Sequence, residues 1–550
     1  MANNANYSKI KPVWLLTATL IVLLLPNIVL SITEPMTLMA RICNILLPAG
    51  VYMMLLSLLR NPARSVWMLF LLIFLSAFQL VLLYLYGHSI IAVDMFLNLV
   101  TTNSAEVTEL LGSMLPAMIG VTVIFVPLLY VAATRARSAA YVISPSLGRL
   151  MRRGGLAAAI AGAACMAVCY AGGNYRAKDS LYPLNVCYNM YLAVDRSIRT
   201  AAYDETSRDF SFQAVATHQA DSLPEIYVLV IGETARAENF GLYGYNRDTT
   251  PLLSAEEGLI KFPRAYTQSN TTHKSVPMLL SAACAGDYDR IYREKGIIAA
   301  FREAGFHTTF LSNQRPNHSF IDIFGCEADS WQFLKETLPA DSNLCDLDML
   351  EPVKQLLADR SRPQLIVLHS YGSHFNYHER YPRSMARFTP DLPDEVTPTN
   401  RPSLLNAYDN TIAYTDHFLH SLITELRRDN ATAALLYTSD HGENIFDDER
   451  ELFLHASPRP SVYELHVPLL IWLSESYRER HPDTASHLAG NTSRLVQTSA
   501  SVFHTMLDIA GISTPLRADS LSVASPRFTS TPYRYLTDRN EAVSWDINDK

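Results

Sequence analysis

Short apolar runs in the second half of the chain end in acidic residues and histidines. The run EIYVLVIG is followed by Glu233, PQLIVL by His369 with His374 five residues later, and TAALLYTS by Asp440 and His441. Taken singly, an acid at a strand end is usually a turn residue or a helix cap. Together, carboxylates and imidazoles are the ligands that a zinc-type dication prefers. These residues therefore predict a metal site.

A hydroxyl-rich segment, QSNTTHKSVPMLL (268–280), runs into a predicted helix with Pro277 in its first turn. Thr271, Thr272 or Ser275 can be an ordinary N-cap. The other interpretation is a nucleophile at a helix N-terminus, where free N–H groups and the helix dipole favour phosphate. A hydroxyl is a poor nucleophile at neutral pH, and a bound dication lowers its pKa. The segment alone leaves both interpretations open.

The runs that deliver these residues alternate with predicted helices. Strands are predicted at 225–233, 307–312, 363–370, 432–439 and 467–473, and helices at about 294–304, 346–359, 403–428 and 495–510. This alternation predicts a mainly parallel sheet covered on both faces. Ligands then bind beyond the carboxyl ends of the strands. The stretch 379–402, rich in Pro and Arg, is predicted to be an irregular loop over the site.

The first third of the chain is much more apolar than the rest, which explains a mean hydropathy of +0.07. A helix needs about 20 apolar residues to cross a bilayer core. Windows of this kind lie at about 13–31, 38–59, 65–86, 113–133 and 156–173. The first window is too long for a signal-peptide core and lacks a following cleavage site, so it is predicted to be an anchor. The sequence predicts an all-α membrane domain of five helices.

The distribution of Lys and Arg between the windows predicts the orientation. The basic residues that precede the first window or lie between windows on the same side are Lys9, Lys11, Arg60, Arg64, Arg135, Arg137, Arg149, Arg152 and Arg153. The loop 87–112 has no Lys or Arg, and only Arg41 lies on the other side. The N-terminus is therefore predicted to be cytoplasmic and everything after about residue 174 to be outside, which in a bacterium means the periplasm.

The predicted organisation has three parts. Residues 1–173 form the membrane domain, 174–222 a connector along the membrane, and 223–550 a catalytic α/β domain. Disulfides can persist in an exported domain, and Cys326 and Cys345, which flank one short segment, are the favoured pair. The formal net charge of −8 indicates no general attraction to nucleic acid.

Four motifs in order resemble a known family. GET at 232–234, TTHKSVP at 271–277, GSH at 372–374 and SDHGE at 439–443 look like the signature of the bacterial phosphoethanolamine transferases. These enzymes modify lipid A or the core sugars of lipopolysaccharide, include those that confer polymyxin resistance, and belong to the alkaline phosphatase–sulfatase superfamily. The resemblance covers nearly the whole chain, with five membrane spans before a periplasmic domain.

The resemblance implies roles for individual residues. Zinc is expected on Glu233, Thr272, Asp440 and His441, with Thr272 as the nucleophile because it stands five residues before Pro277. His374 and His455 match histidines that line the substrate site of the family. His369 also matches a family position, either near the substrate or in a structural role.

Further residues are candidates for substrate binding. Asn98, Thr102 and Glu106 are spaced four apart and share one helix face. They are either a polar surface stripe or, as the resemblance implies, a site near the entry of the lipid headgroup. Lys274 is either a phosphate-neutralising residue or a solvated side chain.

The implied reaction moves phosphoethanolamine from phosphatidylethanolamine to a phosphate or sugar of lipid A or lipopolysaccharide, through Thr272 on zinc, with His374 protonating the diacylglycerol that leaves. Three alternatives compete. A sulfatase needs a C/S-x-P-x-R motif that 268–280 lacks. A lipoteichoic-acid-type phosphoglycerol transferase shares the five-span plan. A membrane anchor or sensor that is not an enzyme would need no intact Glu/Thr/Asp/His set.

Overall fold

The computed structural model describes residues 11–86, 90–101, 104–173, 175–218, 225–339, 344–359, 361–428, 431–457 and 459–547. The chain divides into two compact units. One comprises Met1–Val100 with Glu106–Arg196, and the other Thr101–Ala105 with Ser197–Lys550. We call them the helical unit and the α/β unit.

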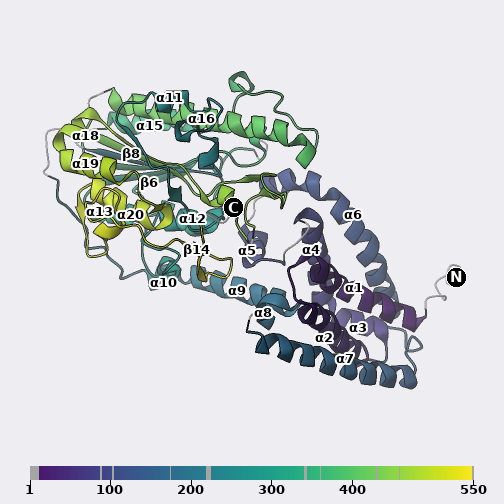
Figure 1. The fold of residues 1–550 in the computed structure, drawn as a ribbon. Helices are drawn as coiled ribbons and strands as arrows, with labels where there is room; N and C mark the ends of the chain where they lie inside the picture. Colours follow the sequence, from purple (N-terminus) through teal and green to yellow (C-terminus); the bar gives the residue numbers. More distant parts are fainter. Residues whose placement is uncertain are drawn as a thin grey trace. The chain divides into compact units, whose positions relative to one another are not determined.

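The helical unit is built from helices, several of them long and apolar (Figure 1). They are α1 (Pro12–Thr33), α2 (Leu38–Leu56), α3 (Pro62–Met68), α4 (Phe70–Tyr86), α5 (Val93–Thr101), α6 (Ser104–Arg135), α7 (Pro145–Ala171), α8 (Ala177–Ser180) and α9 (Leu184–Ala201). Among the described residues, α1, α2, Pro116–Arg135 of α6, and α7 are each long and apolar enough to cross a membrane. A fifth span results if α3 and α4, bent by 67° at their junction, count as one. The five predicted windows are thus found as helices.

Close packing explains why the fifth window is rich in Ala and Gly. A Cβ added to Gly50 would lie 2.4 Å from the backbone nitrogen of Ala159, and one added to Gly162 would lie 2.5 Å from that of Leu47. Small residues let two membrane helices approach this closely. Helices α2 and α7 therefore pack backbone against backbone.

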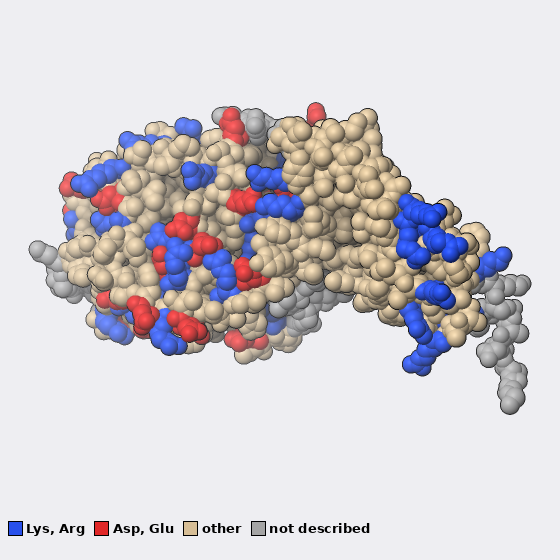
Figure 2. Space-filling view, turned by 90° about the horizontal axis from the view of Figure 1, so that it is seen from below, with Lys and Arg blue, Asp and Glu red and all other residues tan. Residues whose placement is uncertain are grey.

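Figure 2 shows one face of the helical unit as a broad surface without acidic or basic side chains, with Lys and Arg gathered towards one end. The α/β unit carries both signs of charge on the same face. An uncharged belt of this kind suits contact with lipid.

The α/β unit contains a seven-stranded sheet in the order β3-β11-β8-β2-β7-β5-β6. Its strands are β2 (Ile226–Gly232), β3 (Leu259–Lys261), β5 (His307–Ser312), β6 (Ser330–Phe333), β7 (Gln364–His369), β8 (Ala433–Ser439) and β11 (Leu469–Leu473). Five neighbouring strands of this sheet run parallel to one another, in the order β8, β2, β7, β5 and β6. Strands β11 and β3 pair antiparallel at the other edge. The predicted mainly parallel sheet is confirmed, with two short strands, β3 and β6, that the sequence pattern missed.

Helices cover both faces of this sheet (Figure 1). The helices of the unit are α10 (Tyr203–Thr206), α11 (Pro251–Ser254), α12 (Thr272–Leu279), α13 (Ile297–Glu303), α14 (Phe320–Gly325), α15 (Leu350–Ala358), α16 (Arg401–Arg427), α17 (Val462–Leu465), α18 (Glu475–Arg480), α19 (Pro482–Asn491) and α20 (Thr498–Ile509). Alternate residues of β2 point to opposite layers: Leu229 joins the core with α12, α13 and α20, whereas Val228 joins the core with α15 and α16. Burial on both faces explains the continuous apolar runs of the sequence.

Shorter elements complete the unit. They are β1 (Val215–Ala216) with β13 (Ile512–Ser513), β9 (Asn444–Ile445) with β10 (Phe453–Leu454), β4 (Ala265–Tyr266) with β12 (Val496–Gln497), and β14 (Arg534–Leu536) with β15 (Ala542–Ser544). The Pro/Arg-rich stretch 379–402 is irregular up to Asn400, as predicted, with short 3-10 turns, and its last two residues begin α16. Its buried Asp391 accepts hydrogen bonds from Tyr381 and Arg383.

Candidate metal and phosphoryl-transfer site

Three adjacent parallel strands bring acidic residues and histidines to one edge of the sheet. Strand β2 lies between β8 and β7, with Gly232 opposite Ser439 and Ile231 opposite His369. Glu233 and Asp440 are the next residues of their strands, and the Asp440 N–H donates to the carbonyl of Gly232 at 3.0 Å. The sheet register therefore fixes the two carboxylates side by side, as the strand ends predict.

Four side chains with potential metal-ligand atoms surround one point at this edge. Thr272 Oγ1 lies 3.2 Å from Glu233 Oε1 and 3.1 Å from His441 Nε2. His441 Nε2 lies 3.2 Å from Asp440 Oδ2 and 3.6 Å from Glu233 Oε1. Donors on a tetrahedral zinc, at 2.0–2.2 Å from the ion, are about 3.4 Å apart. The spacing of these four side chains fits such an ion.

The structure distinguishes between the two adjacent threonines. Thr272 is the first residue of α12 and directs its hydroxyl at Glu233 and His441. Thr271 is the N-cap residue, makes no side-chain cap bond, and instead contacts the hydroxyl of Ser269. Pro277 is the sixth residue of the helix, so the prediction that it lies in the first turn is wrong.

The electrostatics of the cluster favour a cation. Burial raises the pKa of Glu233, and burial together with the charge of Glu233 raises the pKa of Asp440 well above its usual range. Burial lowers the pKa of His441 well below its usual range. Asp440 Oδ2 is buried and accepts no hydrogen bond from the described residues, whereas Oδ1 accepts from the N–H groups of Thr234 and His441. A dication would offset both buried charges and engage the orphaned oxygen.

Motif glycines make room for this arrangement. A Cβ on Gly372 of the GSH motif would lie 2.6 Å from the carbonyl oxygen of Glu233, and Gly372 has φ +46°. A Cβ on Gly442 of SDHGE would lie 2.1 Å from the carbonyl oxygen of Tyr463. Both positions need close backbone approach, so a larger residue would displace the loops that hold Glu233 and His441.

Gln314 supports the site and was not singled out from the sequence. It follows β5 by two residues and its Nε2 lies 3.1 Å from Glu233 Oε2. The same amide group lies 3.2 Å from Nε2 of His369, whose Nδ1 faces the hydroxyl of Ser312 at 3.1 Å. Burial lowers the pKa of His369 to about 4. Of its two predicted roles, the contacts of His369 favour the structural one, because it positions Gln314.

His455 reaches the site through a hairpin. Strands β9 and β10 pair Asn444 with Leu454, so the next residues, Glu443 and His455, meet. His455 Nδ1 lies 3.3 Å from Glu443 Oε1, and the His455 ring lies 4.1 Å from the ring of His441. Burial alone would lower the pKa of His455, but Glu443 outweighs it and raises that pKa to about 9. The sequence suggested His455 but gave no role to Glu443.

His374 lies in the loop after β7. Its Nδ1 is 2.6 Å from the carbonyl oxygen of Phe375, and its ring stacks on Tyr371 with centroids 5.1 Å apart. Burial, Arg380 and His455 lower the pKa of His374 to about 3. His374 and His455 both act electrostatically on His441, so the structure gathers both predicted substrate-site histidines near the metal-type cluster.

Lys274 has a different environment from either predicted one. Its side chain is buried, with 2% of the residue exposed, and its ammonium donates to the carbonyl oxygens of Thr537 and Asp538, both at 3.0 Å. The solvated alternative is therefore wrong. These contacts favour a role for Lys274 in anchoring the C-terminal segment, and its role in phosphate binding stays a prediction.

Two other groups of predicted residues have different outcomes. Asn98, Thr102 and Glu106 lie outside the residues whose side chains the structure describes.

Cys326 and Cys345 are both free thiols, so the predicted disulfide is wrong. Cys326 caps the end of α14 beside Asp322 and Glu336, whereas Cys345 precedes the 3-10 turn Asp346–Met349 and contacts Tyr414. The two thiols belong to separate local structures, although they are close in sequence.

Known proteins with similar sequences are phosphoethanolamine transferases. The chain is 28% identical over 340 residues to the phosphoethanolamine transferase EptC of Escherichia coli (strain K12), which covers 59% of this chain and 57% of that protein. It is 31% identical over 300 residues to EptA of Salmonella typhimurium (strain LT2), which covers 52% of this chain and 53% of that protein. The chain thus matches little more than half the length of these relatives.

Solved structures extend the similarity to the helical unit. The integral membrane protein lipooligosaccharide phosphoethanolamine transferase A from Neisseria meningitidis is 22% identical, with a TM-score of 0.75 over 92% of this chain and 97% of that one. This match shows a shared fold. The periplasmic domain of EptC from Escherichia coli, solved as a complex with Zn, is 25% identical, with a TM-score of 0.55 over 60% of this chain and 95% of that one.

The family match lies within the α/β unit. The Sulfatase family matches residues 225–512, more than half of the chain, and this range contains β2, α12, β7 and β8 with all four donors of the cluster. The resemblance drawn from the four motifs is confirmed by these similarities, and the chain belongs to the Sulfatase family.

Proposed function

We propose that this protein transfers phosphoethanolamine from phosphatidylethanolamine to a phosphate or sugar of lipid A or lipopolysaccharide. The observation that carries the proposal is the position of the Thr272 hydroxyl, within 3.2 Å of both Glu233 and His441. A hydroxyl held among carboxylates and a neutral imidazole is suited to attack on phosphorus. The names of the relatives supply the substrate class.

Glu233, Thr272, Asp440 and His441 would hold a zinc ion, in agreement with the zinc complex of the EptC domain. When bound, zinc lowers the pKa of a coordinated hydroxyl and offsets charge on the phosphoryl oxygens. The chain supplies the rest. Gln314 and Thr234 fix the carboxylate of Glu233 through hydrogen bonds, and the backbone N–H groups of Thr234 and His441 fix Asp440.

The reaction has two displacement steps. Thr272 releases its hydroxyl proton to water, and its Oγ1 forms a bond to phosphorus while the bond to the diacylglycerol oxygen breaks. That oxygen takes a proton from His455, whose pKa Glu443 raises to about 9, and His374 lines the same site. An acceptor oxygen then bonds to phosphorus, its proton passes to a histidine, and the bond to Thr272 breaks. The covalent phosphoethanolamine–Thr272 species lies between the two steps.

The helical unit fits lipid substrates. We propose that α1, α2, the bent pair α3–α4, α6 and α7 cross the bacterial inner membrane, with the N-terminus in the cytoplasm and the α/β unit in the periplasm. The positions of Arg60, Arg64, Arg135 and Arg137 support this orientation. A sulfatase activity is not proposed, because the segment 268–280 lacks the C/S-x-P-x-R motif.

Mass spectrometry of lipid A and core sugars tests the proposal. Cells that express the protein should gain the mass of one phosphoethanolamine group, cells with Thr272→Ala should not, and cells with Thr271→Ala should gain it as the wild type does. Labelled phosphatidylethanolamine should lose its headgroup in membranes that contain the protein. Turnover of labelled phosphatidylglycerol instead would contradict the proposal and indicate a phosphoglycerol transferase.

A further inference from the structure

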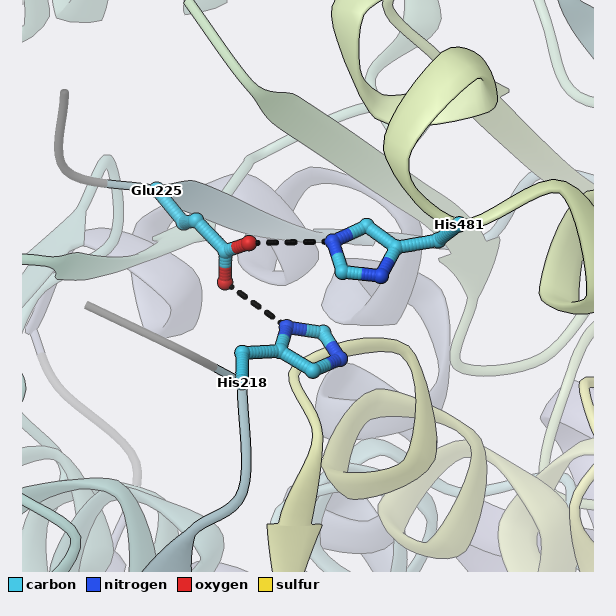
Figure 3. Close-up of side chains that lie close together, drawn as sticks. All are labelled: His218, Glu225 and His481. Carbon is cyan, nitrogen blue, oxygen red and sulfur yellow. Dashed lines mark hydrogen bonds and ion pairs between the residues drawn. The ribbon is translucent and has the colours of Figure 1, made fainter. Parts of the chain in front are cut away.

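A second cluster of metal-ligating side chains lies at the opposite end of β2 from the catalytic cluster. Glu225 precedes the first residue of β2, whereas Glu233 follows the last. Eight residue steps at 3.3 Å separate them, or about 26 Å. Glu225 contacts two histidines with one carboxylate oxygen each: His218, seven residues before it, and His481, at the α18–α19 junction (Figure 3).

The three side chains converge closely. His218 Nδ1 lies 2.9 Å from Glu225 Oε2, and His481 Nε2 lies 3.1 Å from Glu225 Oε1. One ligand atom from each residue lies within 4.8 Å of the other two. The two imidazole rings stack with centroids 4.0 Å apart and direct one nitrogen each at the carboxylate (Figure 3). Two histidines and one glutamate are a common zinc ligand set, with one position left for water.

The surroundings support metal ligation. The buried Tyr227 donates its hydroxyl to Glu225 Oε2 at 2.5 Å, which orients the carboxylate as outer-shell partners of metal ligands do. The side chains are between 14% and 20% exposed, so an ion can reach them.

The backbone around His218 is shaped to its ring. Strand β1 pairs with β13, and the N–H and hydroxyl of Thr217 both donate to the carbonyl oxygen of Gly511. Gly511 has φ +60°, and a Cβ there would lie 2.1 Å from Cδ2 of His218. The ring thus occupies space that only glycine leaves open at this position. His481 is fixed separately, at the junction of α18 and α19.

We propose that His218, Glu225 and His481 form a second zinc site that joins the entry of the α/β unit to the amino end of the sheet and to the α18–α19 junction. The site is independent of the reaction at Thr272. Zinc there closes three segments that are otherwise held by hydrogen bonds and short strands, so it stabilises the folded state in proportion to its affinity.

The number of zinc ions bound per chain tests this site. The full-length protein in detergent is stripped of metal with a chelator and reloaded with Zn²⁺ before the measurement. We expect two zinc ions per wild-type chain, one in His481→Gln, one in Asp440→Asn and none in the double variant. His487→Gln, a histidine of α19 outside the cluster, should keep two. Equal zinc content in wild type and His481→Gln, or none in Asp440→Asn, would overturn the proposal in favour of a hydrogen-bonded ion-pair cluster.

Thermal melting provides a second measurement. In the Asp440→Asn background, Zn²⁺ should raise the melting temperature, and adding His481→Gln should abolish that rise. Gly511→Ala, which displaces the His218 ring but keeps every ligand, should weaken the remaining zinc affinity by at least about 10-fold. If His481→Gln does not fold, the Gly511→Ala titration decides, and an unchanged affinity there would sink the proposal.

Discussion

The hydroxyl oxygen of Thr272 lies 3.1 Å from Nε2 of His441, across 169 positions of sequence. This contact joins the first residue of α12 to the residue that follows the end of β8 by two positions. It depends on the sheet register and on the helix start together. The same geometry places the oxygen that we propose as the nucleophile beside the carboxylate of Glu233, at 3.2 Å.

Removal of the Asp440 carboxylate should separate metal binding from folding. We expect Asp440→Asn to weaken zinc binding by more than about 100-fold, because changes outside the ligand shell alone cost about 10–100-fold. Without metal, the variant should melt at a higher temperature than the wild type, because burial and the charge of Glu233 already disfavour ionised Asp440. Melting curves with and without Zn²⁺ measure both effects. Asp448→Asn, at an exposed ion pair with Arg450, is the control.

The partner of His455 should matter for turnover and little for metal content. Glu443→Gln keeps the shape of the side chain but removes the charge that faces Nδ1 of His455 at 3.3 Å. We expect kcat for headgroup transfer to fall about 10–100-fold, as general acid–base roles contribute 10²–10⁴-fold, with bound zinc unchanged. Glu443→Asp should retain more activity. A wild-type kcat in Glu443→Gln would remove the pair from the mechanism.

Lys274 should act on stability. Lys274→Met leaves the carbonyl oxygens of Thr537 and Asp538 without their ammonium donor. We expect a loss of about 1–3 kcal/mol in the free energy of unfolding and an unchanged KM for phosphatidylethanolamine. Lys261→Met, which removes a similar ammonium–carbonyl bond to Leu242 away from the site, is the comparison. A raised KM at unchanged stability would return Lys274 to phosphate binding.

Glu327 should make the stability of the α/β unit depend on pH. Burial raises its pKa to about 7, although the Gly296 N–H and the Tyr203 hydroxyl donate to it. The unfolded state then loses this proton at lower pH than the folded state, so the free energy of unfolding falls as pH rises from about 4.5 to 7, by about 1–3 kcal/mol.

Glu327→Gln should remove that slope, so the variant gains stability relative to the wild type between pH 5 and pH 8. Parallel melting curves at several pH values measure it. Glu257→Gln serves as the control, because the Glu257 side chain is 83% exposed. Equal pH slopes in wild type and Glu327→Gln would show that Glu327 titrates normally.

The sequence predicts the parts of this fold that burial dictates. Runs such as Ile226–Gly232 are buried on both faces, so their length, their β-branched content and the polar residue after them are visible without structure. The edge strands β3 and β6 are three and four residues long and partly exposed, and no apolar pattern marks them.

Site residues were predictable where a strand end or a motif names them. Glu233 and Asp440 follow buried strands, but Gln314 acts through a loop whose path depends on tertiary packing. The target of Lys274 lies more than 260 positions away, and spacing carries no signal for such a contact. The pairing of Cys326 with Cys345 failed because proximity in sequence does not bring two side chains together.

Strand β2 is flanked at both ends by a glutamate, and the two glutamates face different partners. A slip of β2 by one residue between β8 and β7 would move both carboxylates by about 3.3 Å and turn its side chains to the opposite layers. Two groups of contacts therefore depend on the register of this single strand: Glu233 with His441 at one end, and Glu225 with His218 and His481 at the other. A chain with β2 in the wrong register would lose both groups of contacts at once. Mutations that weaken the pairing of β2 with β7 or β8 should therefore disrupt the two clusters together.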